Sequence, residues 1–395
     1  MFHGNPNLPM SQDLSSLFLL RPEVAFLNHG SFGACPRPVF EEYGRWQREL
    51  EAQPVDFLGR RAPSLLRESR TVLGRYLGCH ANDLVYVTNA TVGMNIVARS
   101  LVLGPGDEVL ATDHEYGACD RAWRFILGKN GASYRHVSIP VPVTAHEDVV
   151  ERIFAAVTSA TRVIFISHIT SPTALTFPVT EVCRRARELG IITLVDGAHA
   201  PGQIPLDLEA VGADFYIGNL HKWLCAPKGA AFLYARREMQ EMLEPLVVSW
   251  GWEAMVPGDS RFIDYLQSLG TADISAPLSV PAAIGFQQEH NWDAVRSRCH
   301  ELVRRARPEI VAALGGGVHL APDSDEWYAQ MSALLLPDGI DGAALQRRLY
   351  EEYLVEIPVF QWNGRQTIRI SMQGYNGWDD VERLLAGIRA ILKSA

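Results

Sequence analysis

The feature that most constrains the fold is a regular alternation of short apolar runs with amphipathic segments between residues 84 and 218. Residues 84–90 and 107–113 are apolar runs typical of buried strands, and residues 91–102 between them have the apolar spacing of a helix. The same alternation predicts further strands at 134–140, 162–169, 191–195 and 215–218, and helices at 118–128, 146–158 and 179–190. Largely apolar strands joined by helices are typical of a mostly parallel sheet covered on both faces. The sequence therefore predicts an α/β fold with a mostly parallel central sheet flanked by helices.

The alternation of predicted strands and helices changes after about residue 270, which indicates a second structural unit. Residues 278–314 form a long helical pattern interrupted near Asn291, and two more strands and two more helices follow. A chain of 395 residues is also too long for one ordinary core. We therefore expect an N-terminal arm over 1–20, a large domain over 21–277 and a smaller α+β domain over 278–395.

Composition disfavours several classes of partner. The net charge is −9 and there is no dense run of Lys or Arg, so neither nucleic acid nor an anionic membrane surface is an expected partner. No apolar stretch is long enough to cross a bilayer, and the first ten residues lack the features of an export signal. The six cysteines include no C-x-x-C pair. We therefore expect a cytoplasmic protein with reduced thiols.

Polar side chains gather where the predicted strands end. The strand ends read TNAT (88–91), DHEYG (113–117), HITSPT (168–173), DGAH (196–199) and GNLHK (218–222). In open α/β sheets, ligands bind beyond the carboxyl ends of the strands. The sequence therefore predicts one functional site along this edge of the sheet.

Asp196 and Lys222 indicate what chemistry this site carries. They end consecutive predicted strands, so both open into the same crevice, and a buried carboxylate needs a partner. A simple ion pair is one explanation. Alternatively, the lysine forms an imine with an aldehyde while the carboxylate holds a protonated pyridine nitrogen. The second arrangement is the one that pyridoxal 5′-phosphate requires.

Thr91 is a candidate for holding the phosphate of such a cofactor. It begins a predicted helix directly after a strand, where free N–H groups and the helix dipole favour an anion. Its hydroxyl adds one more donor. The alternative is that Thr91, or Asn89 before it, only caps the helix.

At this point the chain resembles a known family, the class V aminotransferase superfamily of fold-type I pyridoxal-phosphate enzymes. The resemblance rests on LVDGAHAPGQIPLDLEAVGADFYIGNLHKWLCAPKGAAFLY (194–234). Within the superfamily the chain is similar to the isopenicillin N epimerase-like branch, through FLNHGSFGACPRPV (26–39), TNATVGMN (88–95) and LGTADISAPLSVPAAIGF (269–286). The resemblance covers roughly residues 20–395 and implies the fold-type I architecture.

The resemblance implies a set of cofactor contacts. Lys222 matches the lysine that forms the Schiff base, and Asp196 matches the acid that pairs with the pyridine nitrogen. His199 lies where the family places a group near the ring's phenolic oxygen, with a capping or core histidine as the alternative. The phosphate contacts would come from Ala90, Thr91, Val92, Asn219 and His221. The other lysines follow no predicted site strand: Lys129, Lys228 and Lys393.

Two positions depart from the pattern of relatives. Tyr116 matches the aromatic or histidine residue that stacks on the cofactor ring, where related desulfurases carry His. A tyrosine still stacks, and its hydroxyl is a candidate acid or base; a core tyrosine is the alternative. Ser171 stands where relatives carry an asparagine that contacts the phenolic oxygen, so that contact is in question.

The resemblance also implies how the substrate and a second subunit take part. Arg369 matches the arginine that grips the α-carboxylate of an amino-acid substrate, for which a planar guanidinium is suited; a surface arginine is the alternative. Asn28 and His29 lie in the segment that lines the substrate side in relatives. Thr271 matches a residue that reaches the phosphate of the neighbouring subunit, which implies a homodimer.

Several reactions share the same first step, and the resemblance favours epimerisation among them. Epimerisation needs a second acid or base opposite Lys222, for which Tyr116, His29 and His199 are candidates. Elimination by a C–S lyase and transamination remain open. Sulfur transfer through a persulfide is disfavoured, because the last cysteine, Cys299, precedes the small-domain loops that would carry the nucleophile.

Candidates from other classes fit less well. A nicotinamide-dependent dehydrogenase needs a glycine fingerprint between its first strand and helix, and GPGDEV (104–109) follows a helix instead. A metal site is not expected, since His114, Glu115, His199 and His221 lack a tight ligand spacing. A catalytically silent regulator on the same fold should lack the lysine or the acid, and both are present.

Overall fold

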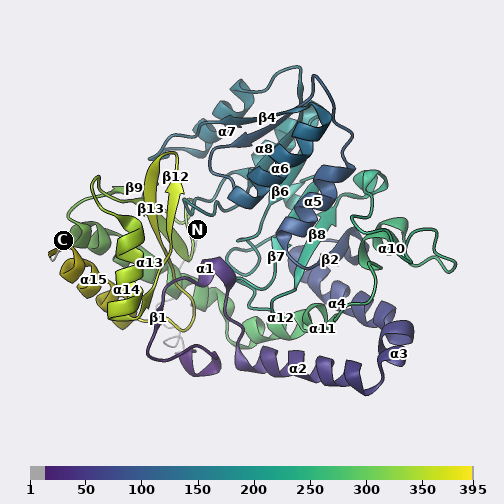
Figure 1. Ribbon diagram of the computed structural model, residues 1–395, viewed down its shortest axis with the longest axis horizontal. Coiled ribbons are helices and arrows are strands. Elements are labelled where there is room, and N and C mark those ends of the chain that lie inside the picture. The colour runs from purple at the N-terminus through teal and green to yellow at the C-terminus, as the bar shows by residue number, and fades with distance from the viewer. Residues whose placement is uncertain (1–13, 394–395) are drawn as a thin grey trace.

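The computed structural model describes residues 14–393, and its larger part is built on a seven-stranded sheet (Figure 1). The strand order is β2-β8-β7-β6-β5-β3-β4. The strands are β2 (Leu84–Val87), β3 (Glu108–Thr112), β4 (Ser133–Val137), β5 (Thr161–Ser167), β6 (Ile192–Asp196), β7 (Phe215–Asn219) and β8 (Ala231–Ala235). All of them run parallel except β8, which is antiparallel to β2 and to β7. The predicted α/β fold with a mostly parallel sheet is thus confirmed.

Strand β8 was not predicted, and it sits between two strands that were. The first predicted strand, 84–90, is also shorter than expected, because the chain turns after Val87 and helix α5 (Ala90–Ser100) begins at Ala90. Asn89 caps this helix by accepting a hydrogen bond from the Val92 N–H. The turn places the beginning of α5 directly at the edge of the sheet where the site was expected.

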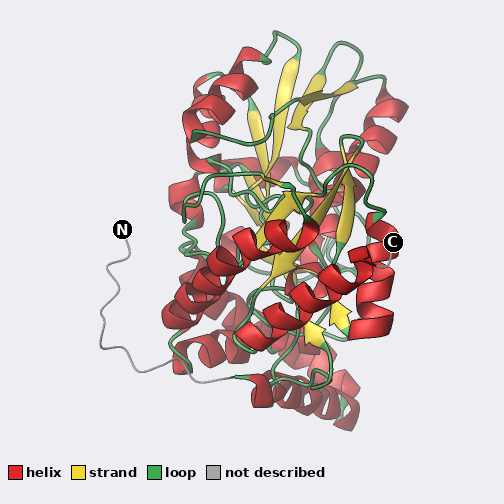
Figure 2. Ribbon diagram, turned by 90° about the vertical axis from the view of Figure 1, so that its left-hand side faces the viewer, coloured by secondary structure: helices red, strands yellow, loops and turns green. Residues whose placement is uncertain are grey.

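Alternate residues of the six strands other than the edge strand β4 enter two separate hydrophobic clusters, one on each face of the sheet. In β5, for example, Ile164 and Ile166 belong to one cluster, whereas Val163 and Phe165 belong to the other. Such two-sided burial explains why these strands are largely apolar, whereas β4 at the edge contains polar and partly exposed residues. Figure 2 shows helices on both sides of the strands. The helices of this part are α2 (Arg37–Ala52), α3 (Pro54–Asp56), α4 (Ala62–Leu77), α5, α6 (Gly117–Asn130), α7 (His146–Ala155), α8 (Val179–Glu188), α9 (Leu208–Val211), α10 (Arg261–Gln267), α11 (Ser275–Leu278) and α12 (Val280–Glu289).

The C-terminal part contains a second, four-stranded antiparallel sheet. Its order is β12-β13-β10-β9, with β9 (Val318–His319), β10 (Met331–Leu335), β12 (Val359–Trp362) and β13 (Arg365–Ser371). The accompanying helices are α13 (Trp292–Leu314), α14 (Gly342–Tyr353) and α15 (Trp378–Lys393). The predicted helical stretch 278–314 is interrupted as expected, because Asn291 has a positive φ of 46°. The proposed domain boundary at 277/278 stays a prediction.

The N-terminal segment lies against the C-terminal part of the chain rather than beside the strands that follow it in sequence. Strand β1 (Ala25–Phe26) pairs in parallel with β11 (Val355–Glu356), and helix α1 (His29–Phe32) follows directly. Figure 1 shows α1 between the small sheet and the larger part of the molecule. Of the expected arm over 1–20, the first thirteen residues lie outside the described residues, whereas Leu14 and Phe18 are buried.

Between residues 14 and 393, no helix combines the length and the apolar character that crossing a membrane requires.

Candidate active site

The carboxyl ends of β2, β5, β6 and β7 surround a cavity of about 600 Å³, at the edge of the sheet that the strand-end residues indicated. Its wall contains ten of the fourteen residues that the sequence and the resemblance single out: Ala90, Thr91, Val92, Tyr116, Ser171, Asp196, His199, Asn219, His221 and Lys222. The other four, Asn28, His29, Thr271 and Arg369, lie outside this wall.

Asp196 and Lys222 open into this same cavity but do not form an ion pair with each other. Asp196 ends β6 with only 4% of its surface exposed, and its Oδ1 accepts a hydrogen bond from the Ala198 N–H at 2.9 Å. Its Oδ2 lies 3.6 Å from the Cys119 thiol. Burial raises the pKa of Asp196, while the nearby charge of Lys222 acts in the opposite direction. The carboxylate therefore lacks a direct cationic partner, as a site for a protonated ring nitrogen requires.

The amine of Lys222 is held by His199 in a form suited to attack an aldehyde. The Lys222 Nζ lies 3.1 Å from His199 Nε2, and His199 Nδ1 accepts a hydrogen bond from the Trp223 indole at 3.2 Å. Since Nδ1 accepts, a neutral His199 carries its proton on Nε2 and donates it to a neutral lysine amine. Burial, with the charge of Arg369 second, lowers the pKa of Lys222 to about 8. The pKa of His199 is lowered by burial and then by Lys222, which keeps the imidazole neutral.

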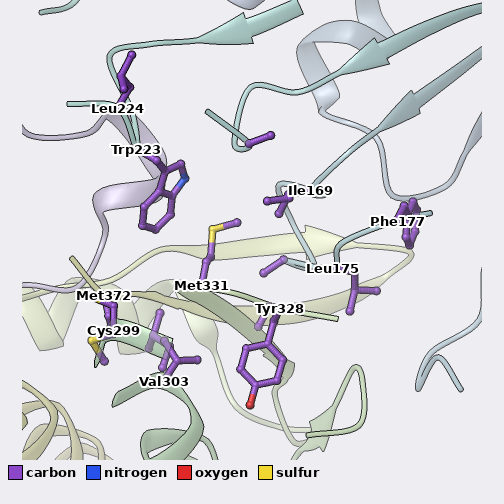
Figure 3. Close-up of a cluster of buried hydrophobic side chains, with 14 of the residues drawn as sticks. Ile169, Leu175, Phe177, Trp223, Leu224, Cys299, Val303, Tyr328, Met331 and Met372 are labelled. Atoms are coloured by element: carbon purple, nitrogen blue, oxygen red, sulfur yellow. The ribbon is translucent and has the colours of Figure 1, made fainter. Parts of the chain in front are cut away.

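The loop that carries Lys222 is anchored in the core. Trp223, Leu224 and Cys225 are completely buried, and Figure 3 shows Trp223 near Met331 of β10. The Trp223 side chain therefore packs between the large sheet and the small sheet. Its indole N–H also donates the hydrogen bond that orients His199. This anchoring fixes the direction from which the lysine amine enters the cavity.

The beginning of α5 offers a partly prepared anion site. The Ala90 N–H is donated to Asn219 Oδ1 and the Val92 N–H to Asn89 Oδ1, each at 2.9 Å. The N–H groups of Ala90 and Val92, whose backbone the resemblance assigns to the phosphate, are thus already hydrogen-bonded within the chain. Among the described residues, the Thr91 N–H has no hydrogen-bond partner, and neither does the buried His221 Nδ1. These unpartnered atoms fit an acceptor such as a phosphate oxygen.

The cavity wall also contains groups that sequence reasoning missed. Lys228 lines the cavity and donates a hydrogen bond to the Gly33 carbonyl at 3.0 Å. It was set aside at first because it follows no predicted strand of the site. Ser167, Ser31 and Phe32 line it as well. Their strand-end or N-terminal positions were the only sequence signals for them.

Glu115, directly before Tyr116, was likewise considered only as a metal ligand. Its carboxyl accepts hydrogen bonds from the hydroxyls of Thr112 and Ser167, both at 2.6 Å, which ties the end of β3 to the end of β5. Burial raises the pKa of Glu115 to about 8. The ring of Tyr116 lines the cavity and is 46% exposed, which agrees with a stacking position rather than a core position.

Arg369 lies just behind the cavity wall. Its Nη1 donates to the Ser171 carbonyl at 2.7 Å and its Nη2 to the Ser31 hydroxyl at 3.2 Å, and both serines line the cavity. The side chain is buried on β13, so the alternative of a surface arginine is wrong. Burial lowers the pKa of Arg369 to about 9.

Asn28 and His29 are buried outside the cavity wall. His29 Nδ1 lies 2.9 Å from the Tyr375 hydroxyl, and its Nε2 lies 3.0 Å from the Lys222 carbonyl. Asn28 donates to Glu356 and accepts from Ser31. Both side chains therefore support the segments around the cavity, in place of the expected direct exposure to substrate.

Thr271 lies in a different hollow of the surface. This hollow is bordered by α4 and by residues 249–274, and Thr271 is exposed in it.

Comparisons with known proteins identify the family of this chain. The profile of the aminotransferase class-V family matches residues 34–384. Isopenicillin N epimerase from Streptomyces clavuligerus is 37% identical over 387 residues, which cover 94% of this chain and 96% of the relative. A putative L-cysteine desulfhydrase from Oryza sativa subsp. japonica is 31% identical over 411 residues, covering 93% and 83%.

A solved structure of similar fold is the apo cysteine desulfurase from Thermococcus onnurineus NA1. It superposes with a TM-score of 0.82 at 19% identity and covers 98% of this chain and 99% of its own. The fold-type I architecture is therefore confirmed, and so is the resemblance to the epimerase-like branch. The chain belongs to the aminotransferase class-V family and is an enzyme that depends on pyridoxal 5′-phosphate.

Proposed function

We propose that the protein acts at the α-carbon of an amino acid or amino-acid-like substrate, as an epimerase or racemase similar to isopenicillin N epimerase. The observation that carries this proposal is the shared cavity of Lys222 and Asp196, with the guanidinium of Arg369 directly behind its wall. The 37% identity to two isopenicillin N epimerases over nearly the whole chain supports epimerisation over the other reactions of the family.

The cavity offers a residue for each part of the cofactor. Lys222 would hold its aldehyde carbon, Asp196 its ring nitrogen, and the Thr91 N–H with His221 its phosphate. When bound, pyridoxal 5′-phosphate supplies an electron sink for the charge left at the α-carbon. Asp196 keeps that sink effective, because a buried carboxylate favours the protonated form of the nitrogen beside it.

Lys222 is the proposed base on one side of the substrate. A neutral Nζ can take the α-proton, and the lowered pKa of Lys222, about 8, makes the neutral amine far more abundant near physiological pH than it is for an ordinary lysine. His199 would orient this amine through the 3.1 Å contact with Nε2. Arg369 would hold the substrate carboxylate, since no carboxylate of the described chain is hydrogen-bonded to the guanidinium.

Epimerisation needs a second acid on the opposite side, and we assign this role to Tyr116. His29 lies outside the cavity wall with both ring nitrogens in contact with other groups, and His199 lies beside Lys222 itself. Tyr116 is therefore the remaining candidate that lines the cavity and is open to it. The phenol hydroxyl of Tyr116 would act as the acid that returns a proton to the α-carbon from this side.

Elimination from a sulfur-containing amino acid is the second candidate reaction. The identity of 31% to a putative L-cysteine desulfhydrase favours it. No cysteine lines the cavity, and the last cysteine, Cys299, is buried in α13, so within the described chain a persulfide route has no nucleophile. An elimination without sulfur transfer needs none.

The proposed homodimer rests on an apolar surface next to Thr271. Trp250, Met255 and Val256 are exposed by 82%, 90% and 86%, and Trp250 and Val256 border the same hollow as Thr271. An apolar patch of this kind is typical of a protein interface. In the proposed dimer, Thr271 reaches the phosphate end of the partner's cavity.

Hydrogen exchange at the α-carbon distinguishes these reactions. The loaded enzyme is incubated in deuterium oxide with a panel of L- and D-amino acids, and deuterium content, product chirality and released fragments are recorded. Epimerisation predicts deuterated product of inverted configuration without fragments. Release of pyruvate and sulfide from cysteine would support elimination, and absence of exchange with every amino acid would contradict both.

A further inference from the structure

Residues 28–33 separate the two groups that the proposed function assigns to the substrate, Lys222 and Arg369. A Cβ on Gly33 would lie 2.0 Å from the His221 carbonyl oxygen and 2.8 Å from the Lys222 Cα. On the other side, a Cβ on Gly30 would lie 2.9 Å from Ser371 Oγ and 3.3 Å from Arg369 Nη2. The segment is therefore wedged between the loop of the lysine and the strand of the arginine, and its thickness sets their separation.

Ser31 is the member of this segment that faces both the cavity and Arg369. Its side chain lines the cavity, whereas Arg369 does not. The Ser31 hydroxyl accepts a hydrogen bond from Arg369 Nη2 at 3.2 Å and donates one to Asn28 Oδ1 at 2.6 Å. Asn28 in turn donates to Glu356 Oε1 at 3.1 Å, which fixes the orientation of its amide.

The guanidinium of Arg369 has unused capacity at this point. Its Nη1 is occupied by the Ser171 carbonyl at 2.7 Å, but the buried Nε has no hydrogen-bond partner among the described residues. A buried cation that is hydrogen-bonded only to neutral groups is costly unless an anion joins it. Ser31 and Ser171 both line the cavity and both accept hydrogen bonds from this guanidinium, so an anion that approaches Arg369 along these contacts meets the two serines.

We propose that Ser31 is a substrate-binding residue whose hydroxyl, together with Arg369 Nη2, holds the substrate's carboxylate. The hydroxyl turns its proton from Asn28 Oδ1 to the carboxylate, while Arg369 supplies the charge behind it. This inference rests on the proposed function, because it requires an amino-acid substrate. It names Ser31 as the residue that distinguishes amino acids from the amines that lack a carboxylate.

The experiment measures binding of matched ligand pairs to the loaded enzyme, through the shift of its visible absorbance band rather than through turnover. The pairs are L-alanine with ethylamine and L-cysteine with cysteamine, which differ only by the carboxylate. The wild type should bind each amino acid more tightly than its amine. Ser31→Ala should lower this preference about tenfold, as expected for a hydrogen bond to a charged group, and should leave the affinity for the amine unchanged.

Two further variants separate a direct contact from a structural effect. Ser31→Thr retains the hydroxyl and should restore most of the preference, whereas Ser64→Ala, at an exposed serine of α4, should leave it unchanged. An equal loss of affinity for amino acid and amine in Ser31→Ala, or an unchanged preference, would overturn the assignment. Absence of the visible band in the wild type would overturn the proposed function itself, so the two failures are distinguishable.

Discussion

Several ionisable side chains around the cavity are buried without a matching counter-ion, and this burial shifts their pKa values. Lys222 and Arg369 both have pKa values below their ordinary range, to about 8 and about 9, because each is buried. Glu115 has a raised pKa for the same reason. These shifts increase the uncharged fraction of the Lys222 amine, favour a protonated Glu115 at neutral pH, and leave Arg369 as a cation that attracts a carboxylate.

The raised pKa of Glu115 predicts that the free energy of unfolding depends on pH. Its pKa is about 8 in the folded protein against 4.5 ordinarily, so the protonated form stabilises the fold at low pH. This contribution is complete below pH 4.5 and is lost as the pH rises to about 8, at a cost of up to about 5 kcal/mol. Glu115→Gln should therefore gain free energy of unfolding relative to the wild type between these pH values.

Urea unfolding of the apo protein at pH 5 and pH 8 measures this gain, with Glu351→Gln at an exposed position of α14 as the control. A difference between wild type and Glu115→Gln that stays constant with pH would show that Glu115 is ionised throughout.

The amine of Lys222 predicts the pH dependence of cofactor capture. Only the neutral amine attacks an aldehyde, and the neutral fraction rises about tenfold per pH unit below the pKa of about 8. The rate at which apo protein acquires the visible band should rise steeply up to about pH 8 and level off above it. Stopped-flow absorbance measures this rate, and a rise that continues to pH 10 would contradict the lowered pKa.

How far the sequence predicts the site differs from residue to residue. Lys222 and Asp196 follow apolar runs at strand ends, so their meeting could be inferred from topology alone. Ser31 and Lys228 come from loops, whose paths no apolar pattern defines. Glu115 could not be recognised as a bridge between β3 and β5, because its role depends on the hydroxyls of Thr112 and Ser167.

At the scale of elements, the short helix α1, with Gly30 inside it and Gly33 directly after it, connects the two parts of the chain. Strand β1 pairs with β11 across more than three hundred residues, and a pairing at that distance leaves no local signal in the sequence. Strand β8 was missed for a different reason: its apolar run was attributed only to the motif around Lys222. The parallel strands and their helices were predicted correctly because their alternation is local.

Gly33 tests the contact between α1 and the loop of Lys222. Its φ is +70°, and an added Cβ would meet the His221 carbonyl oxygen at 2.0 Å. Gly33→Ala should lower the free energy of unfolding by about 2 kcal/mol or more and slow cofactor capture, because the lysine loop must shift. Thermal unfolding and absorbance measure both effects. Gly59→Ala is the control, because nothing lies within 4 Å of a Cβ added there. Equal free energies of unfolding and equal rates of cofactor capture in the two variants would contradict the close contact between Gly33 and the loop of Lys222.

At the scale of the whole molecule, the exposed apolar surface predicts association of two chains. Light scattering after gel filtration should give twice the 43.8 kDa of one chain. Trp250→Glu should shift the protein toward the monomer, because it places a charge in the apolar patch. Val102→Glu, at a residue that is 99% exposed elsewhere on the surface, should not. A monomeric wild type would contradict the proposed dimer and the role of Thr271.

The central claim, that Lys222 carries the cofactor while Asp196 faces its ring, has one direct test. The loaded protein is reduced with borohydride, which fixes the bond between the lysine and the cofactor, and the labelled peptide is identified by mass spectrometry. The predicted result is a single pyridoxyl group on Lys222, with the visible band lost in Lys222→Ala, retained in Lys129→Ala and altered in Asp196→Asn. A label on Lys228 or another lysine, or a protein that acquires neither label nor band, would contradict the account.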